Sequence, residues 1–597
     1  MTRMKGHTPS PAYLNSLTVE DASLSITVNE GDLPEFLQVA NDAIRRDDQE
    51  QARVHLNDSN IAIVQNILLK DPGRTDLMFI LGYLLEEIGS FGKACTWYQR
   101  LFALEPHAMI AQRLCVLFQK NRNCLSDAIA YGEHAVHLDP QNPVCLMLLG
   151  KCLITAGQRQ RGRALLKKAL RMKPDSYALW AAHLWFEHYF EDWGPAQFHQ
   201  GYQTLSHIKR HHSFVYTTYE NDPDPDRRLR VGLLSPNFFD CSAAVTLEPF
   251  LDGYNRDVLE VIGYGNLAKM DHVTDRMIAK LDRFTNIFGM PNDEVAHLIR
   301  ADQIDVLVGV AGLCQHNRLG MMRYKAAPVQ VDWGGLDTSG INEIRYRISD
   351  VVLDPPSRQQ YYLEETVYLE GGMFCFRPIM KTPLVGPLPA IRNGFVTFGS
   401  FNNCKKISDT TLAMWVEVLQ RIPNSRLFLK LANVHDELVR KTYLAMFTRC
   451  GIAPERIHLK GYMSHFDHLQ VLGQVDLVLD TFPFNGFIST FDALWMGVPV
   501  LSLCGETWVA CGGATLLTRV GLDVFVAHNR QEYVQKACAV AKQLDQLNTI
   551  RQSLRPLLLA SPLCDCQRYA RELEGALRGM WRGWVNNRMK SEDGVAM

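Results

Sequence analysis

Short apolar runs alternate with amphipathic segments along the chain from about residue 227 onward. The runs have the length of buried strands, and the segments between them carry apolar residues at helical spacing. This alternation predicts two parallel β-sheets covered by helices. The expected strands of the first sheet are residues 227–235, 258–265, 304–312 and 327–335, and those of the second are 395–403, 426–432, 456–461, 475–480 and 499–503.

A turn-rich stretch, residues 354–393, separates the two sets of expected strands. It contains six prolines, which interrupt both helices and central strands. We therefore expect two Rossmann-like lobes, at 227–353 and 394–560, with 354–393 as an inter-lobe linker. The carboxyl ends of both sheets would line the cleft between the lobes, where open α/β sheets bind ligands. Residues 561–597 are expected to form a helix that crosses back over the first lobe, followed by a tail.

A different pattern, with a period of 34 residues, precedes the lobes. The period is marked by Pro72, Pro106, Pro140 and Pro174. With small residues at matching places, it resembles the tetratricopeptide repeat, in which pairs of antiparallel helices stack into a solenoid. We expect this region over 31–212, after a flexible N-terminus at 1–30. The expected units are 75–106, 109–140 and 143–174, with a degenerate unit over about 40–72 and capping helices over 178–212.

The composition narrows the class of protein. Hydrophobic residues make up 47% of the chain and charged residues 21%, which are ordinary values for a soluble globular protein. A net charge of −2 gives no electrostatic reason to expect nucleic acid or an anionic membrane as a partner. The 15 cysteines form no paired framework, and this favours a reducing cytoplasm. We also expect no membrane span, because no run is long and apolar enough.

Polar residues gather at the ends of the expected strands of the second sheet. No GxGxxG or GxxxxGK[ST] motif follows any strand, which disfavours dinucleotide dehydrogenases and P-loop ATPases. The first polar cluster contains Asn403 and Lys406, where an amide can read a base or ribose and an ammonium can balance a diphosphate. A solvated loop is the alternative interpretation of this cluster. The second contains His465 and His468, which suit hydrogen bonds to phosphate or ribose better than a metal, for which further ligands are missing.

The third cluster lies in the stretch DLVLDTFPFNGFISTFDALWMGVPV, residues 476–500. Its pattern predicts a strand, a sharp turn at Gly486, a helix that starts near Ser489 and Thr490, and a second strand. A helix start has unpaired N–H groups and a partial positive charge, so it binds anions without a cationic side chain. Asp492, one turn into the helix, can accept a hydrogen bond from a ribose hydroxyl. An ordinary βα turn with hydroxyl capping is the alternative interpretation.

Taken in order, these clusters resemble the catalytic region of the O-linked N-acetylglucosaminyltransferase family, glycosyltransferase family 41. The resemblance covers about residues 75–585, and its most specific part is the TFPFNG…FDALWMGVPV block. Other segments that carry it are LRVGLLSPNF (229–238), APVQVDW (327–333), Thr338-Ser339-Gly340, Gly505-Glu506-Thr507 and SPLCDCQRYARELEGALRGMW (561–581).

The resemblance implies an α + α/β architecture, with a tetratricopeptide-type α-solenoid followed by a GT-B fold of two Rossmann-like lobes. It implies an inverting, metal-independent O-glycosyltransferase that moves a sugar, first of all N-acetylglucosamine, from a UDP-sugar to Ser or Thr of a protein. The UDP-sugar is a co-substrate, and no cofactor or metal is expected. The partner would be a protein or peptide acceptor reached through the solenoid, which is also suited to a homodimer. Flagellins and adhesins are acceptors by family analogy only.

Particular roles follow from the resemblance by position. Lys406 is assigned to catalysis, as the cation that neutralises the β-phosphate of the departing UDP. Donor binding is assigned to Asn403 (nucleotide), Lys406 (phosphate), His468 (uracil or ribose), Gly486 (the turn), Ser489 and Thr490 (diphosphate) and Asp492 (ribose). No residue is assigned as the catalytic base.

The sequence departs from the family's pattern mainly at histidines. Cys241, Leu313 and Phe487 occupy places where the family usually has a histidine. Phe487 makes the expected nucleotide pocket more apolar, which bears on the identity of the donor. The turn Leu336-Asp337-Thr338 is one residue shorter than its counterpart in the family.

The acceptor side therefore has fewer polar groups than usual in the family. His316 and Asp337 are the nearby residues that could replace part of it. Cys241, Cys314 and Cys511 are interpreted as small fillers rather than nucleophiles, since no partner base is in register. Three functions stay open: a protein O-glycosyltransferase, a transferase with another donor such as UDP-glucose or another acceptor (Asn or a small molecule), and a catalytically impaired binding or scaffold protein.

Overall fold

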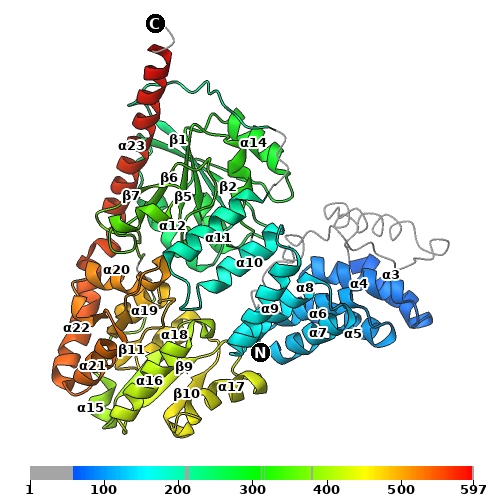
Figure 1. Cartoon of the computed structure of the whole chain (residues 1–597), viewed down its shortest axis with the longest axis vertical. Helices are drawn as coiled ribbons and strands as arrows, with labels where there is room; N and C mark the ends of the chain where they lie inside the picture. Colours follow the sequence, from blue (N-terminus) through cyan, green and yellow to red (C-terminus); the bar gives the residue numbers. More distant parts are fainter. Residues whose placement is uncertain (1–57, 209–213, 311, 315, 378–380, 594–597) are drawn as a thin grey trace. The chain divides into compact units, whose positions relative to one another are not determined.

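The computed structural model describes residues 58–208, 214–310, 312–314, 316–377 and 381–593 (Figure 1). The chain divides into two compact units. The first comprises the described residues up to His183 together with His435–Arg440, and the second comprises Leu184–Val434 and the described residues from Lys441 onward. The expected flexible N-terminus at 1–30 lies outside the described residues, as does the first part of the expected repeat region.

The first unit is built from helices in antiparallel pairs, blue to cyan in Figure 1. They are α3 (Asp58–Lys70), α4 (Thr75–Glu87), α5 (Phe91–Leu104), α6 (Ala108–Lys120), α7 (Leu125–Leu138), α8 (Pro143–Thr155) and α9 (Arg159–Met172). The pairs α4/α5, α6/α7 and α8/α9 confirm the three expected units. Glycines allow close packing within a pair, because a Cβ on Gly150 of α8 would lie 2.8 Å from the carbonyl oxygen of Gly162 of α9.

Two helices, α10 (Tyr177–Glu187) and α11 (Pro195–His207), follow the repeats in the region expected to contain helices. Helix α11 belongs to the second unit, where it packs against the first lobe. His199 Nδ1 lies 2.9 Å from the carbonyl oxygen of Tyr361. A Cβ on Gly340, which has φ +69°, would lie 2.8 Å from the carbonyl oxygen of Tyr202, so only glycine permits this approach.

The first lobe contains a seven-stranded parallel sheet in the order β3-β2-β1-β4-β5-β6-β7. Its strands are β1 (Leu229–Ser235), β2 (Leu259–Gly265), β3 (Arg283–Asn286), β4 (Val306–Val310), β5 (Val329–Trp333), β6 (Tyr346–Ser349) and β7 (Glu365–Tyr368). The apolar pattern identified β1, β2, β4 and β5, whereas it missed the four-residue strands β3, β6 and β7. Strand β7 lies within the stretch 354–393 that was expected to be only a linker, so the first sheet extends into it.

The second lobe contains a six-stranded parallel sheet in the order β10-β9-β8-β11-β12-β13. Its strands are β8 (Thr397–Ser400), β9 (Arg426–Lys430), β10 (Ile457–Lys460), β11 (Leu477–Leu479), β12 (Val500–Leu503) and β13 (Val526–Ala527). All five expected strands are present, and the two-residue strand β13 was missed. The strand order changes direction between β8 and β11, and such a switch point places ligands at the carboxyl ends of the strands.

Helices cover both sheets (Figure 1). Those of the first lobe are α12 (Ser242–Gly253), α13 (His272–Ile278) and α14 (Asn292–Ala301), with the 3₁₀ turns η2 (Leu319–Tyr324) and η3 (Pro356–Tyr361). The second lobe and its flanks contain α15 (Pro389–Asn393), η4 (Cys404–Lys406), α16 (Asp409–Arg421), α17 (Glu437–Thr448), η5 (Pro454–Arg456), α18 (His465–Leu472), α19 (Ile488–Trp495), η6 (Trp508–Ala510), α20 (Gly512–Arg519), η7 (Asp523–Phe525), α21 (Arg530–Val540), α22 (Leu544–Ala560) and η8 (Pro562–Cys564).

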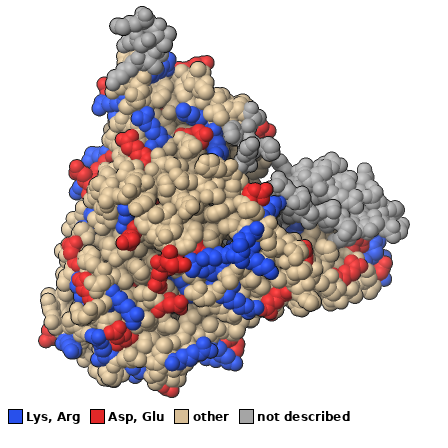
Figure 2. Space-filling model, viewed as in Figure 1, with Lys and Arg blue, Asp and Glu red and all other residues tan. Residues whose placement is uncertain are grey.

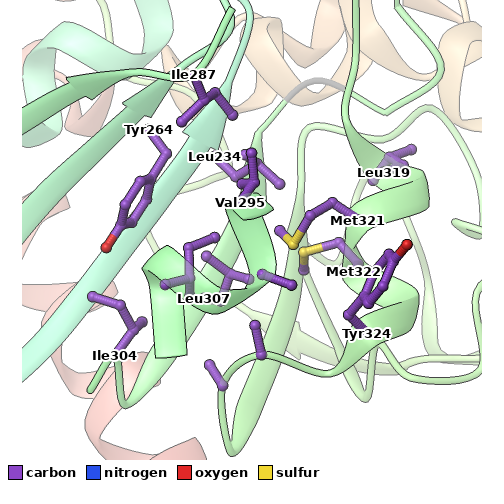
Figure 3. Packing of buried hydrophobic residues seen from close by; sticks show 14 of the residues in the cluster. Leu234, Tyr264, Ile287, Val295, Ile304, Leu307, Leu319, Met321, Met322 and Tyr324 are labelled. Atoms are coloured by element: carbon purple, nitrogen blue, oxygen red, sulfur yellow. The ribbon is translucent and has the colours of Figure 1, made fainter. Parts of the chain in front are cut away.

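One hydrophobic core lies between the first sheet and the segment formed by α14 and η2 (Figure 3). Leu234 and Leu307 come from the central strands β1 and β4, and Val295 and Met322 come from the covering helices. All four side chains are almost completely buried, which stabilises the fold by about 1.5–3 kcal/mol for each such residue. Close packing in this core therefore holds the first sheet and its covering helices in fixed positions.

The last helix, α23 (Cys566–Asp593), packs against α12 of the first lobe, as the sequence predicted (red in Figure 1). The approach is close, because a Cβ on Gly253 would lie 2.4 Å from the carbonyl oxygen of Cys566. Further along, the Trp581 indole N–H donates to the carbonyl of Asp224 at 3.1 Å. The helix thus ties the end of the second lobe to the start of the first.

Charged side chains of both signs are spread over the face shown in Figure 2, in keeping with the net charge of −2. Among the described residues, no helix combines the length and the apolar character that crossing a membrane requires.

Candidate functional site

The candidate site lies at the carboxyl ends of β8 and β11, the two strands at the switch point of the second sheet. The segment after β8 contains Asn402 and Lys406, and the segment after β11 contains Asp480 and Gly486. These two segments, some 80 residues apart in the chain, are joined by direct hydrogen bonds. These bonds join the first and the third of the polar clusters that the sequence singled out.

Asp480 organises the turn that follows β11. Its buried carboxylate accepts hydrogen bonds from the backbone N–H of Gly486 at 2.8 Å, from the Asn402 side chain at 2.9 Å and from the Ser502 hydroxyl at 2.7 Å. Burial raises the pKa of Asp480 above its ordinary value, and these hydrogen bonds oppose the rise. Sequence reasoning did not select Asp480, although its place at the end of the apolar run VDLVLD was a usable signal.

Gly486 is required by the crowding inside the turn. A Cβ at this position would lie 2.5 Å from the Ser489 hydroxyl, 2.9 Å from the Thr490 hydroxyl and 3.0 Å from the Asn402 side-chain oxygen. The Ser489 hydroxyl donates to that same oxygen of Asn402 at 2.7 Å. Glycine thus allows the start of α19 to close onto the segment after β8.

Helix α19 begins at Ile488 with an open N-terminus. Its N-cap residue, Phe487, makes no side-chain cap hydrogen bond. Within the described part of the chain, no protein acceptor is found for the backbone N–H groups of Ile488 and Ser489. These donors and the helix dipole make the start of α19 suited to an anion. Of the two hydroxyl residues expected here, Ser489 is partly exposed and Thr490 is buried.

Lys406 supplies a cation next to this helix start. Its ammonium donates to the carbonyl oxygen of Asn485 at 2.6 Å and lies 4.1 Å from the ring centroid of Phe484. Burial lowers the pKa of Lys406 to about 8, while the charge of Asp480 acts in the opposite direction. A desolvated ammonium of this kind gains strongly from a nearby anion.

His468 and Asp492, expected at the nucleotide, lie side by side with His465. One carboxylate oxygen of Asp492 is 3.2 Å from His465 Nε2, and the other is 3.3 Å from His468 Nε2. His468 Nδ1 also lies 3.2 Å from the Lys430 ammonium. Burial alone would raise the pKa of Asp492, but the hydrogen bonds from the two imidazoles prevail and lower it. The same contact raises the pKa of His465.

Metal binding by these histidines finds no support in their surroundings. Among the described residues there is no group of three or more His, Cys, Asp and Glu side chains arranged to hold a metal ion. His465 and His468 instead share the carboxylate of Asp492.

The two asparagines after β8 differ in their roles. Asn403, the expected nucleotide contact, is exposed and caps η4 by accepting a hydrogen bond from the backbone N–H of Lys405 at 3.2 Å. Asn402, which the sequence did not single out, is buried and bridges Asp480 and Ser489. Asn402 therefore shapes the turn, and Asn403 lies on the surface beside it.

Aromatic rings surround the helix start on the side of Phe487. The ring of Phe487 stacks on Trp508 at a centroid distance of 5.1 Å and packs against Phe374 at 5.2 Å. The buried Trp508 Nε1 and Thr507 Oγ1 have no hydrogen-bond partner among the described residues. The wall is thus apolar where the family usually carries a histidine, yet it contains two polar groups that a ligand could satisfy.

The first-lobe residues considered for the acceptor side lie in other environments. Asp337 is buried, and its carboxylate lies 3.3 Å from His188 Nε2. Burial raises the pKa of Asp337 well above its ordinary value and lowers that of His188 to about 3. The carbonyl oxygen of His316 accepts a hydrogen bond from the Asn266 side chain at 2.9 Å. Neither Asp337 nor His316 is identified as a base by these contacts.

Cys241 and Cys314 lie close to Asn237 in the first lobe. Cys241 Sγ is 3.7 Å from the carbonyl oxygen of Asn237, and Cys314 Sγ is 3.9 Å from its side-chain nitrogen. Burial raises the pKa of both thiols, that of Cys314 to about 12. Neutral thiols are weak nucleophiles, which supports their interpretation as small fillers.

Comparison with known proteins identifies the family. A sequence profile of glycosyl transferase family 41 matches residues 196–377 and 389–573, together more than half of the chain. The chain belongs to glycosyl transferase family 41. A tetratricopeptide-repeat profile also matches residues 125–184. The family 41 membership confirms the resemblance on which the site assignments were based.

Curated relatives and a solved structure agree with this family 41 assignment. The protein named probable UDP-N-acetylglucosamine–peptide N-acetylglucosaminyltransferase SPINDLY from Petunia hybrida is 36% identical over 382 residues, which are 63% of this chain and 41% of that protein. The similarly named SEC protein of Arabidopsis thaliana is 27% identical over 369 residues, which are 60% of this chain and 37% of that protein. The chain therefore spans about two fifths of the length of these relatives.

The solved structure of a mutant O-GlcNAc transferase from Thermobaculum terrenum resembles this chain over most of its length. It superimposes with a TM-score of 0.75 at 28% identity, and the match covers 93% of this chain and 98% of that one. The fold expected from the sequence, tetratricopeptide-type helices followed by two Rossmann-like lobes of the GT-B type, is confirmed by this similarity.

Proposed function

We propose that this chain is an inverting protein O-glycosyltransferase that transfers N-acetylglucosamine from UDP-N-acetylglucosamine to Ser or Thr of a protein. One relationship carries the proposal: the partly buried Lys406 ammonium is hydrogen-bonded to the carbonyl oxygen of Asn485, directly before the turn that opens α19. A cation and a helix start at one turn suit a diphosphate. The names of the SPINDLY and SEC relatives support the donor and the acceptor class.

The diphosphate would bind at the start of α19. The backbone N–H groups of Ile488 and Ser489 would donate to its oxygens, with the Thr507 hydroxyl and the Trp508 indole N–H as further donors. Asp492 would accept from the ribose hydroxyls, since its two imidazole partners keep it ionised. Asn403, exposed beside the turn, would contact the nucleotide.

The transfer step makes the bond from the acceptor oxygen to the anomeric carbon and breaks the bond from that carbon to the β-phosphate oxygen. The proton of the acceptor hydroxyl passes to solvent. Attack on the face opposite UDP inverts the anomeric centre. The departing UDP gains negative charge, which Lys406 and the helix start stabilise. Such a preorganised charge contributes about 10²–10³ in kcat when measured by removal of one group. No metal is part of this proposal.

A second candidate function differs only in the donor. Phe487, Trp508 and Phe374 form an apolar wall at a place where the family usually offers a histidine. Such a wall provides fewer hydrogen bonds to a sugar or phosphate, and this favours a change of donor. UDP-glucose is therefore tested beside UDP-N-acetylglucosamine.

The deciding experiment is transfer from a panel of radiolabelled nucleotide-sugars to proteins of a bacterial lysate. Label from UDP-N-acetylglucosamine in protein, released by base-catalysed elimination from Ser or Thr, supports the first candidate. Label from another donor supports the second. No label from any donor, together with retained UDP binding by calorimetry, would leave only a binding or scaffold protein. Absence of UDP binding would overturn both enzymatic candidates.

The proposal also covers how the acceptor binds, where the protein is located and whether it forms a dimer. We propose that the helical repeats hold a protein or peptide acceptor, as stacked helix pairs present extended surfaces. We further propose that the protein is cytoplasmic and that it forms a homodimer through the repeats. Light scattering over a range of protein concentrations would test the dimer, since a constant monomer mass would contradict it.

A further inference from the structure

Two cysteines meet at the base of a short loop beside the candidate site. Cys504 directly follows β12 and Cys511 directly precedes α20, and their sulfur atoms are 3.4 Å apart. The backbone N–H of Gly505 donates to the carbonyl of Ala510 at 2.9 Å and closes the loop between them. A Cβ on Gly505 would lie 2.8 Å from the Cβ of Ala510, so glycine permits this approach.

An arginine from the first lobe contacts this pair. Arg358 of η3 is buried, and its guanidinium lies 3.3 Å from Cys511 Sγ while it donates to the carbonyl of Gly505 at 3.1 Å. The other side of the guanidinium donates to the carbonyl of Leu353 at 2.6 Å. The cation is therefore held in place at the sulfur atom by two backbone carbonyls.

The two thiols differ in acidity because of these contacts. The hydrogen bond from Cys504, assisted by Arg358, lowers the pKa of Cys511 to about 7 in spite of its burial. The same hydrogen bond and burial raise the pKa of Cys504. Cys511 is therefore the more acidic of the two thiols, and an acidic thiol next to a second thiol is the arrangement of an oxidisable dithiol.

A second close pair of cysteines has no guanidinium hydrogen-bonded to either sulfur among the described residues. Cys115 and Cys152 lie 3.7 Å apart in the repeat region, and both are almost completely buried. The hydrogen bond between the two sulfur atoms, together with burial, raises the pKa of Cys115 well above its ordinary value. This pair provides an internal control within the same chain.

We propose that Cys504 and Cys511 form a redox-active dithiol that hydrogen peroxide converts to a disulfide. The Cys511 thiolate attacks one peroxide oxygen, so that an S–O bond forms, the O–O bond breaks and hydroxide leaves, taking a proton to become water. The Cys504 sulfur then attacks Cys511 as its proton passes to the departing hydroxyl group, which leaves as a second water. Two thiols are oxidised, and one peroxide is reduced to two waters.

The loop connects this chemistry to the nucleotide turn, a consequence that rests on the proposed function. The backbone N–H of Asn485 donates to the carbonyl of Val509 within the loop at 2.9 Å. The carbonyl of Asn485 in turn accepts from Lys406. Formation of the disulfide shortens the distance between the sulfur atoms to about 2.05 Å, which shifts the loop. This shift weakens the hydrogen bond between the Asn485 N–H and the Val509 carbonyl. Oxidation should therefore weaken UDP binding at least threefold.

Thiol mapping of the full chain tests the dithiol without any variant. After graded hydrogen peroxide treatment, free thiols are alkylated and the peptides are identified by mass spectrometry. A peptide linked through Cys504 and Cys511, formed while Cys115 and Cys152 stay reduced and reversed by dithiothreitol, supports the proposal. Oxidation of the exposed Cys450 with both loop thiols still reduced overturns it.

Two variants test the roles of the individual groups. Cys504→Ser should leave a sulfenic acid on Cys511 that dimedone traps, and Arg358→Gln should slow disulfide formation at least fivefold. An unchanged oxidation rate in Arg358→Gln, with the wild-type melting temperature, contradicts the role of the guanidinium. Cys538→Ser in α21 is the matched control, and its Cys504 and Cys511 should form the disulfide at the wild-type rate.

Calorimetry with UDP separates the two proposals. Weaker UDP binding to the oxidised chain than to the reduced chain supports the connection to the nucleotide turn. Equal binding by both forms overturns that connection and leaves the dithiol. No binding by the reduced chain overturns the proposed function, and the mass-spectrometric result on the dithiol stands by itself.

Discussion

The Lys406 ammonium donates a hydrogen bond of 2.6 Å to the carbonyl oxygen of Asn485, and Gly486 follows directly. The contact fixes a partly buried cation at the turn that opens α19. It also explains why the lysine, although in a loop after β8, is directed to the segment after β11. Sugar transfer and the pH dependence of UDP binding should both depend on this contact.

Replacement of Lys406 by Ala should lower kcat about 10²–10³-fold, because the departing diphosphate loses the cation at this turn. Steady-state kinetics with the preferred nucleotide-sugar measures the loss. Lys405→Ala is the matched control, since the Lys405 ammonium lies over the Phe186 ring at 5.7 Å and not at the turn, and its activity should stay within twofold of wild type. Equal losses in both variants would contradict a specific role of Lys406.

The affinity for UDP should fall as the pH rises through the pKa of Lys406. Burial lowers that pKa to about 8, and a bound diphosphate favours the ammonium, so binding at higher pH requires uptake of a proton. UDP keeps a constant phosphate charge above about pH 7, since its second pKa is about 6. We expect about tenfold weaker binding at pH 9 than at pH 7 by calorimetry, and a flat profile for Lys406→Ala. A flat wild-type profile would show that the lysine does not contact the ligand.

Gly486→Ala should disturb the turn, because the new Cβ would lie 2.5 Å from the Ser489 hydroxyl. We expect a loss of about 1–3 kcal/mol in the free energy of unfolding and a weaker affinity for UDP. Gly575→Ala in α23 is the control, since a Cβ there meets open space and alanine favours a helix. Thermal unfolding and UDP titration of both variants test this prediction. If Gly486→Ala and Gly575→Ala had the same stability and the same affinity for UDP, the assignment of Gly486 to the nucleotide turn would be wrong.

Asp492→Asn should lower the pKa of His465, because its hydrogen bond to the carboxylate raises that pKa. NMR titration of the imidazole protons measures the change. The raised pKa of His465 contributes stability that is present below its unfolded pKa and lost as the pH rises through the folded value. The lowered pKa of Asp492 contributes stability above its unfolded pKa that is lost as the pH falls through the folded value. Wild type should therefore exceed Asp492→Asn in stability most clearly at about pH 5–6.

Phe487→His should change the ratio of kcat/KM between UDP-N-acetylglucosamine and the alternative donors. The ring stacks on Trp508 at the helix start, so an imidazole there would add a hydrogen-bonding group to an apolar wall. Phe487→Leu keeps the wall apolar and serves as the control. Identical donor ratios in the three proteins would remove Phe487 from the determinants of donor choice.

Much of the fold follows from local patterns. The repeats are visible because Pro106, Pro140 and Pro174 close helix pairs at a fixed period. The long strands are visible because a strand buried on both faces is a continuous apolar run. Strand β6 was missed because Arg347 interrupts its apolar pattern, and the ion pair with Asp354 at 2.7 Å that permits its burial cannot be read from the sequence.

The candidate site was predictable to the level of segments. The sequence placed Lys406, His468 and Gly486 near strand ends, because the carboxyl ends of parallel strands lie at one edge of a sheet. It did not find Asp480, whose importance lies in hydrogen bonds from Asn402 and Ser502 of other segments and from Gly486 of its own turn.

The sequence by itself determined the helix pairs, the two parallel sheets and the turn that opens α19, because these depend on periodicity and on residues close together in the chain. Only the tertiary structure decided that Lys406 bonds to Asn485, that two histidines share Asp492, and that Arg358 lies against Cys511. Each of these contacts joins segments that the chain separates by tens of residues or more. Their partners are fixed by strand order and lobe packing, which no local pattern encodes.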